Sequence, residues 1–210
     1  ESSEKGYTSE LTMDPTWMVD PLDGTTNFIH GLPLCCVSIA MSHNKVPVVG
    51  VVYNPALDEL FVAVRGHGAY FNGTKIHVPE RVHDLSKAML ITEYGVSKDP
   101  ETLDAIFDRI RRLISQMQSV RCIGSCAINL CNVALGRADA FFEVGFGGCW
   151  DCAAGSLIVT EAGGAVADPE GGAFDVMSCR VLAAGPDLVP KIANILRQAK
   201  KSNKEPQFRL

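Results

Sequence analysis

The first half of the chain consists of short apolar runs separated by turn residues, a pattern typical of β-strands. Residues 16–20 are expected to form a short buried strand that ends in a carboxylate, because the Pro and Gly that follow favour a turn. Asn72 and Gly73 lie between two further runs and predict a two-residue hairpin. The remaining strand candidates, joined by connections of hairpin length, are residues 33–41, 46–53 and 60–64. We therefore expect the first half to be largely antiparallel sheet.

The second half changes to the spacing of helices. Asp99 and Pro100 suit the N-cap and first turn of a helix, and apolar residues then recur on one face as far as Met117. Further elements are expected, namely helices over residues 125–135, 151–161 and from about 186, and strands over residues 140–144 and 180–184. This alternation predicts one domain of stacked helix and sheet layers. The polar residues 201–210 are expected to be a loose tail.

Composition and charge narrow the class of protein. The 210 residues are 47% hydrophobic and 20% charged, which suits a globular domain with a substantial core. The net charge of −5 and the lack of a basic stripe make nucleic acid an unexpected partner. No apolar stretch approaches the roughly 20 residues that span a bilayer, so no membrane partner is expected. An anionic substrate would therefore need positive charge from a bound metal ion.

Two further features concern where the protein works and how much of it the sequence represents. The eight cysteines lie in apolar segments and are interpreted as buried thiols of a protein in a reducing compartment, the cytoplasm. The first residue, Glu1, is not a Met, and residues 1–12 resemble the middle of a protein. We therefore expect a further segment upstream.

Residues 17–28, WMVDPLDGTTNF, place two carboxylates close together in the chain. Asp20 and Asp23 flank Pro21, whose fixed φ helps to hold a turn that brings both side chains toward one point. Two such charges about 4 Å apart repel by roughly 1 kcal/mol in water and about 4 kcal/mol at an effective dielectric of about 20, so a cation between them would be stabilising. With the carbonyl of Leu22 they offer hard oxygen ligands that suit Mg²⁺. The alternative is a solvated turn, since Asp, Pro and Gly are common turn residues.

A third carboxylate stands in a second string, residues 150–164, WDCAAGSLIVTEAGG. Asp151 lies at the expected N-terminus of an otherwise apolar helix, where it could also be a simple helix cap. Both strings match signature motifs of the inositol monophosphatase family, and residues 65–73, RGHGAYFNG, are similar to a hairpin of that family. The resemblance extends from Thr16 to about Arg197.

The resemblance implies a fold class and a metal site. The expected fold is α+β, a layered αβαβα sandwich like that of inositol monophosphatases and fructose-1,6-bisphosphatases but lacking the N-terminal helices. Residues 1–210 would then be one partial phosphatase domain. By the resemblance, Glu1 would be the family's metal-binding and water-activating Glu if its position is shifted by one residue. The other implied Mg²⁺ ligands are Asp20, the carbonyl of Leu22, Asp23, which would bridge two metals, and Asp151.

The same resemblance implies roles in catalysis and substrate binding. Thr25 would orient the attacking water, and the amides of Gly24 and Thr25 would hold the phosphate. Glu143 would accept hydrogen bonds from a polyol, with a solvated surface carboxylate as the alternative. For Ser125 and Cys126, helix capping and packing explain the residues equally well. The residues implied to contact the substrate are Leu22, Asp23, Gly24, Thr25, Gly124, Ser125, Cys126, Glu143 and Asp151.

The implied activity is Mg²⁺-dependent, lithium-sensitive hydrolysis of myo-inositol monophosphate by metal-activated water in a homodimer. Residues 144–149, VGFGGC, depart from the family pattern, because they are one residue longer and have Gly147 and Gly148 where several animal members carry a His. The alternatives are a phosphatase for histidinol phosphate, galactose 1-phosphate or fructose 1,6-bisphosphate, or a bisphosphate nucleotidase. A catalytically silent homologue with a regulatory role is the alternative outside the enzymes.

Overall fold

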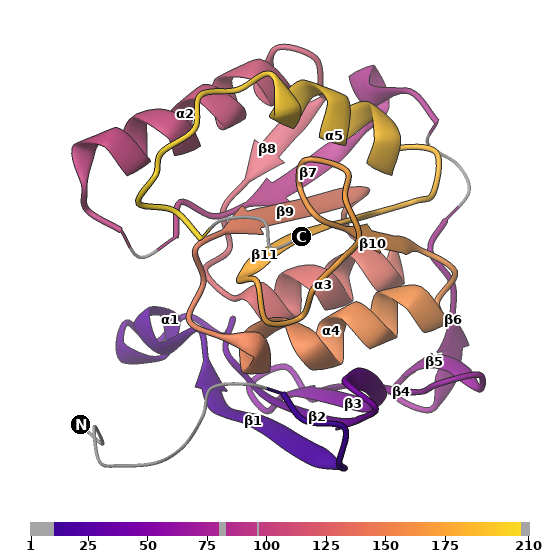
Figure 1. Cartoon of the computed structure of the whole chain (residues 1–210). Coiled ribbons are helices and arrows are strands. Elements are labelled where there is room, and N and C mark those ends of the chain that lie inside the picture. Colours follow the sequence, from indigo (N-terminus) through magenta and orange to yellow (C-terminus); the bar gives the residue numbers. More distant parts are fainter. Residues whose placement is uncertain (1–10, 80–82, 96, 207–210) are drawn as a thin grey trace, which may run out of the picture.

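The computed structural model describes residues 11–79, 83–95 and 97–206 and contains two sheets with helices between and above them (Figure 1). Glu1, which the resemblance implied as a metal ligand, lies outside the described residues. No helix in the described ranges is both long and apolar enough to cross a bilayer.

A six-stranded antiparallel sheet forms from the first part of the chain, in the order β1-β2-β3-β4-β5-β6. Its strands are β1 (Thr16–Asp23), β2 (Cys36–His43), β3 (Val46–Asn54), β4 (Glu59–Val64), β5 (Gly68–Phe71) and β6 (Thr74–Ile76). The prediction of an antiparallel meander, including the hairpin at Asn72 and Gly73, is confirmed. The expected strand over residues 33–41 begins later, at Cys36, because the Asn54 side chain donates a hydrogen bond to the Pro33 carbonyl outside the ladder.

The prediction that the first strand ends at Asp20 is wrong. Strand β1 continues to Asp23, and its register against β2 shifts between Asp20, which faces Ser38, and Asp23, which faces Cys36. One extra residue on β1 makes a bulge there, and bulges re-aim the side chains beside them. The two carboxylates are therefore presented by a distorted strand end.

The second sheet has five strands in the order β10-β11-β9-β7-β8. Strands β9 (Ala140–Val144) and β11 (Arg180–Ala184) have the predicted bounds, whereas the other three were not predicted. These three elements are β7 (Met89–Thr92), β8 (Ser119–Arg121) and β10 (Ala165–Ala167). Runs of three or four residues carry too little periodicity to be recognised. Pairing stabilises them instead, because β10 pairs with β11, β7 with β9, and β8 with β7.

Five α-helices complete the described fold, α1 (Thr25–Ile29), α2 (Pro100–Ile114), α3 (Cys126–Leu135), α4 (Cys149–Glu161) and α5 (Val189–Arg197). Helix α3 has its predicted ends, because the Ser125 hydroxyl accepts a hydrogen bond from the Ile128 N–H at 3.2 Å and Gly136 ends the helix at φ +79°. Helix α2 ends at Ile114 rather than 117, α4 begins two residues earlier than predicted, and α5 begins at Val189 rather than near 186.

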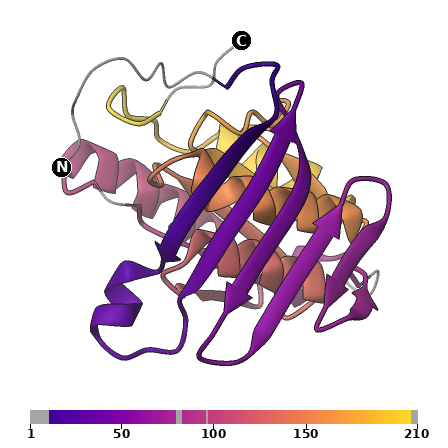
Figure 2. The ribbon, with the colours of Figure 1, turned by 90° about the horizontal axis from the view of Figure 1, so that it is seen from below.

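The layers follow from where the apolar side chains lie. Helices α3 and α4 are buried between the two sheets, and α2 and α5 cover the other face of the five-stranded sheet (Figure 1). In the described ranges no helix covers the outer face of the six-stranded sheet (Figure 2). Trp17 and Val19 of β1 are exposed. The predicted layered class is confirmed, with four of its layers, αβαβ, within the described residues.

The prediction of a loose tail is wrong for residues 201–206. Ser202 and Glu205 are buried, and a carboxylate oxygen of Glu205 lies 2.7 Å from the Arg109 guanidinium of α2. Arg180 donates a further hydrogen bond to the Pro206 carbonyl at 3.0 Å. A polar sequence alone does not reveal this docking, because it depends on a buried cation that the rest of the fold places beneath the tail. Residues 207–210 lie outside the described part.

The interpretation of all eight cysteines as buried thiols needs a correction. None of them forms a disulfide among the described residues, but Cys122 is exposed and Cys149 and Cys179 are only half-buried. Cys149 and Cys152 also have C-x-x-C spacing, on the first turn of α4. The cysteines therefore carry little information about compartment.

Asp108 of α2 fastens the start of the C-terminal segment and should make stability depend on acid. Hydrogen bonds from Arg112 and the Lys200 N–H, at 2.7 and 3.0 Å, hold the pKa of Asp108 below its usual range. Because the folded-state pKa is depressed, this stabilisation is complete above the unfolded pKa of about 3.9 and is lost gradually as pH falls from there to the folded-state pKa. We expect Asp108→Asn to lower the melting temperature by about 2 to 6 °C near pH 7 and by less near pH 2. Thermal melts that show the same difference in melting temperature between Asp108→Asn and the parent at both pH values would contradict the expected pH dependence.

Candidate active site

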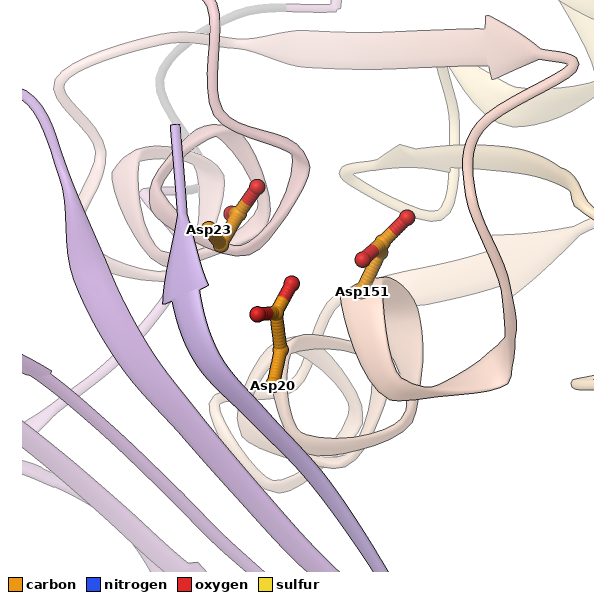
Figure 3. Close-up of side chains that lie close together, drawn as sticks. All are labelled: Asp20, Asp23 and Asp151. Atoms are coloured by element: carbon orange, nitrogen blue, oxygen red, sulfur yellow. The ribbon is translucent and has the colours of Figure 1, made fainter. Parts of the chain in front are cut away.

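Three aspartates from two distant parts of the chain meet at one point. Asp20 and Asp23 lie at the bulge of β1, and Asp151 lies on the first turn of α4. One carboxylate oxygen from each lies within 4.8 Å of the other two, and the side chains converge (Figure 3). The sequence predicted these residues as ligands, and the structure brings them together.

Hydrogen bonds between side chains and the backbone hold the bulge in shape. The Leu22 N–H donates to the Asp20 carboxylate at 2.9 Å, and the Thr25 hydroxyl donates to the Leu22 carbonyl at 3.0 Å. Gly24 has φ +81°, and a Cβ there would lie 2.7 Å from the Leu34 carbonyl oxygen, so only glycine fits. Helix α1 then begins at Thr25. The Leu22 carbonyl keeps one lone pair for a further ligand.

The N-terminal turn of α3 supports Asp23. The Ser125 hydroxyl and the Ala127 N–H donate to the same oxygen of Asp23, at 2.6 and 2.8 Å. Ser125 also accepts the capping hydrogen bond of α3, so the capping explanation applies to this residue. The protein thereby fixes Oδ2 of Asp23.

Asp151 combines two roles that the sequence left as alternatives. Its carboxylate accepts the Gly148 N–H at 3.2 Å, a capping interaction at the start of α4, while it also faces the other two aspartates. Ser38 of β2 donates to the Trp150 carbonyl at 2.9 Å and so ties this helix end to the six-stranded sheet. The position of Asp151 therefore depends on a contact between α4 and strand β2.

Burial and mutual repulsion disfavour the ionised forms of Asp23 and Asp151. Burial is the main reason why the pKa of Asp23 is raised, and burial together with the neighbouring Asp20 raises the pKa of Asp151 to about 7. A divalent cation would relieve both effects, because it supplies opposite charge where solvent is excluded. The oxygen-only donor set of three carboxylates and the Leu22 carbonyl fits a hard cation such as Mg²⁺.

A pocket of about 280 Å³ adjoins Asp23 and Asp151. Its wall includes the predicted Gly124, Ser125, Cys126 and Glu143, and among its described lining residues there is no Lys, Arg or His. Glu143 is only 6% exposed, so the alternative of a solvated surface carboxylate is wrong. Burial raises its pKa well above the usual range, and its Oε2 has no hydrogen-bond partner in the described part of the chain.

Sequence reasoning missed Glu93, which also lines the pocket. Glu93 follows β7, a strand too short to be predicted, and no motif quoted above contains it. Nothing in the sequence alone distinguished it from an ordinary surface carboxylate.

The fold and the carboxylate cluster define a layered α/β protein with an oxygen-ligand site suited to divalent cations. A sequence model of the inositol monophosphatase family matches residues 1–201, and the chain belongs to this family. It is 53% identical to "Inositol monophosphatase 2" of Solanum lycopersicum over 90% of this chain and 71% of that protein.

Solved structures agree with this assignment. The inositol monophosphatase from Anabaena (Nostoc) sp. PCC 7120 superposes with a TM-score of 0.83 and 38% identity, covering 89% of this chain and 73% of that one. The 2'AMP-bound structure of SaIMPase-II superposes with a TM-score of 0.75 and 25% identity, covering 88% and 70%.

Proposed function

We propose that this protein is a phosphoric monoester hydrolase that converts myo-inositol monophosphate to inositol and inorganic phosphate with Mg²⁺. The observation that carries the proposal is the meeting of Asp20, Asp23 and Asp151 beside a pocket whose described walls hold no cationic side chain. A phosphate ester can enter such an acidic pocket only with a cation. Relatives named inositol monophosphatase at about half identity support the polyol as substrate.

Asp20, Asp23, Asp151 and the Leu22 carbonyl would hold the metal. When bound, Mg²⁺ would supply positive charge for the phosphate and the leaving oxygen and lower the pKa of water. Asp23 is prepared for this role, because the hydrogen bonds from Ser125 and Ala127 occupy one of its oxygens and leave the other for the cation. The protein thus pays little to orient this ligand when the metal arrives.

Thr25 is proposed to orient the attacking water. Its hydroxyl proton is directed to the Leu22 carbonyl, so its oxygen lone pairs remain free to accept a hydrogen bond from a water molecule. The amides of Gly24 and Thr25 are proposed phosphate donors at the start of α1. Direct in-line attack then requires no covalent intermediate, and positioning supplies much of the catalysis.

The buried Glu143 is proposed to recognise the polyol. Its unpartnered Oε2 can accept a hydrogen bond from a substrate hydroxyl, and a ligand that satisfies a buried acceptor gains affinity. Gly124 and Cys126 would form the adjoining wall. The metal-ligand role of Glu1, the homodimer and the cytoplasmic location also remain proposals from the family resemblance.

Phosphate release from inositol 1-phosphate tests the function. We expect Mg²⁺-dependent turnover and a kcat/KM higher than for galactose 1-phosphate, histidinol phosphate, fructose 1,6-bisphosphate and a 3',5'-bisphosphonucleoside. A higher value for one of these would move the substrate assignment to that compound. Lack of turnover on all five, with no phosphate-dependent Mg²⁺ binding in calorimetry, would instead favour the catalytically silent homologue.

A further inference from the structure

Glu93 has an unusual set of partners for a carboxylate that stands at a strand end. Its Oε1 accepts hydrogen bonds from the Ile123 N–H and the Gly124 N–H, both at 2.7 Å, and from the Asn129 side-chain amide at 2.9 Å. Three donors from one loop and the following helix therefore converge on a single oxygen. Charge-assisted hydrogen bonds of this kind are stronger than neutral ones.

The same loop is held from its other side by Asn27 of α1. The Asn27 amide donates to the Ile123 carbonyl at 2.7 Å and to the Leu34 carbonyl at 2.8 Å. Both polar backbone groups of Ile123 are thus engaged, one by Glu93 and one by Asn27. This arrangement joins the short helix after the metal ligands to the opposite wall of the pocket.

Gly124 shows how close the contact is. Its φ is +88°, and a Cβ at this position would lie 2.9 Å from the Asn27 amide nitrogen. Gly124 itself lines the pocket beside Ser125. A small shift of this loop would therefore change the shape of the pocket wall.

We propose that Glu93 is a positioning residue that holds Ile123 and Gly124 in place and so sets the fit of the pocket to the polyol part of the substrate. The effect on the substrate rests on the proposed function. The phosphate side should be less affected, because Asp23 is bonded by Ser125 and by Ala127 of α3. Glu93 therefore acts on specificity through the wall and touches none of the reacting atoms.

The test compares Glu93→Gln with the parent on two substrates. The substitution keeps the size of the side chain and one acceptor oxygen but removes the charge, so the three charge-assisted hydrogen bonds become weaker neutral ones. We expect KM for inositol 1-phosphate to rise about tenfold, the size of effect typical of supporting residues, with kcat changed less than about threefold. For 4-nitrophenyl phosphate, which has no ring hydroxyls, both constants should stay within about threefold.

Ile192→Val serves as the control, because Ile192 of α5 is buried in a separate core. This substitution should lower the stability of the protein without changing KM for either substrate. An unchanged KM for inositol 1-phosphate in Glu93→Gln, or an equal rise for both substrates, would overturn the proposal.

Amide hydrogen exchange provides a readout that does not depend on activity. We expect Ile123 and Gly124 to exchange faster in Glu93→Gln and to keep the parent rate in Ile192→Val. If the parent hydrolyses no phosphomonoester, the proposed function fails, while faster exchange still supports the role of Glu93 in holding the loop. Unchanged exchange at both amides would overturn that role even in an active enzyme.

Discussion

Replacing Asp151 with Asn is expected to lower kcat/KM for inositol 1-phosphate by more than about 100-fold, since even outer-shell partners of a metal cost 10- to 100-fold. Asn keeps the shape of the side chain but removes one of the three charges that converge at the site. Calorimetric Mg²⁺ titration should show weaker binding in the variant. The matched control is Asp104→Asn on the exposed face of α2, which should retain parental kinetics.

The same substitution should stabilise the protein when divalent cations are removed by a chelator. The folded-state pKa of Asp151 is raised above the unfolded value of about 3.9, so the charged form destabilises the fold increasingly as pH rises from about 4 to beyond the folded pKa of about 7. Asp151→Asn should therefore melt at a higher temperature than the parent near pH 8 and at a similar temperature near pH 4. Full activity of Asp151→Asn, or a lower melting temperature in chelator near pH 8, would contradict the assignment of this carboxylate.

Replacing Glu205 with Ala is expected to lower the free energy of unfolding by about 3 kcal/mol, the lower end of the range for breaking a buried ion pair. The Arg109 guanidinium and the Glu205 carboxylate are both about 95% buried and share two hydrogen bonds. Loss of the carboxylate would leave the guanidinium buried without its partner, and release of residues 201–206 would let water relieve part of that cost. Denaturant unfolding measures the change.

Two further variants distinguish the effect of the buried ion pair from the effect of exposed charges nearby. Lys204→Ala removes only exposed ion pairs with Asp99 and Glu101 and should leave the free energy of unfolding nearly unchanged. The double variant Arg109→Met with Glu205→Leu should recover most of the loss, because apolar side chains can replace a buried pair at little cost. A Glu205→Ala variant as stable as the parent would mean that the C-terminal segment is not docked in solution.

Local chemistry in the sequence determined much of the fold. The cap at Ser125, the glycine at 136 and the Asn72-Gly73 turn act over a few residues. Helix α3 was therefore predicted with its correct ends, and the hairpin with its correct turn. The two motifs, through their resemblance to a known family, also predicted that Asp20, Asp23 and Asp151 would meet, and they do. An Asp beside a turn or at a helix start is common by itself, so no one of these residues alone indicated the cluster.

Tertiary structure alone decided the features that depend on distant partners. The bulge that continues β1 to Asp23 exists only against β2, and the short strand β7 only against β8 and β9. Glu93 became recognisable only when the fold brought it to the loop at Ile123, and Glu205 only when α2 placed Arg109 beneath it. The physical reason is that a buried charge or a short strand is stabilised by its partner, and the distance along the chain between partners carries no local signal.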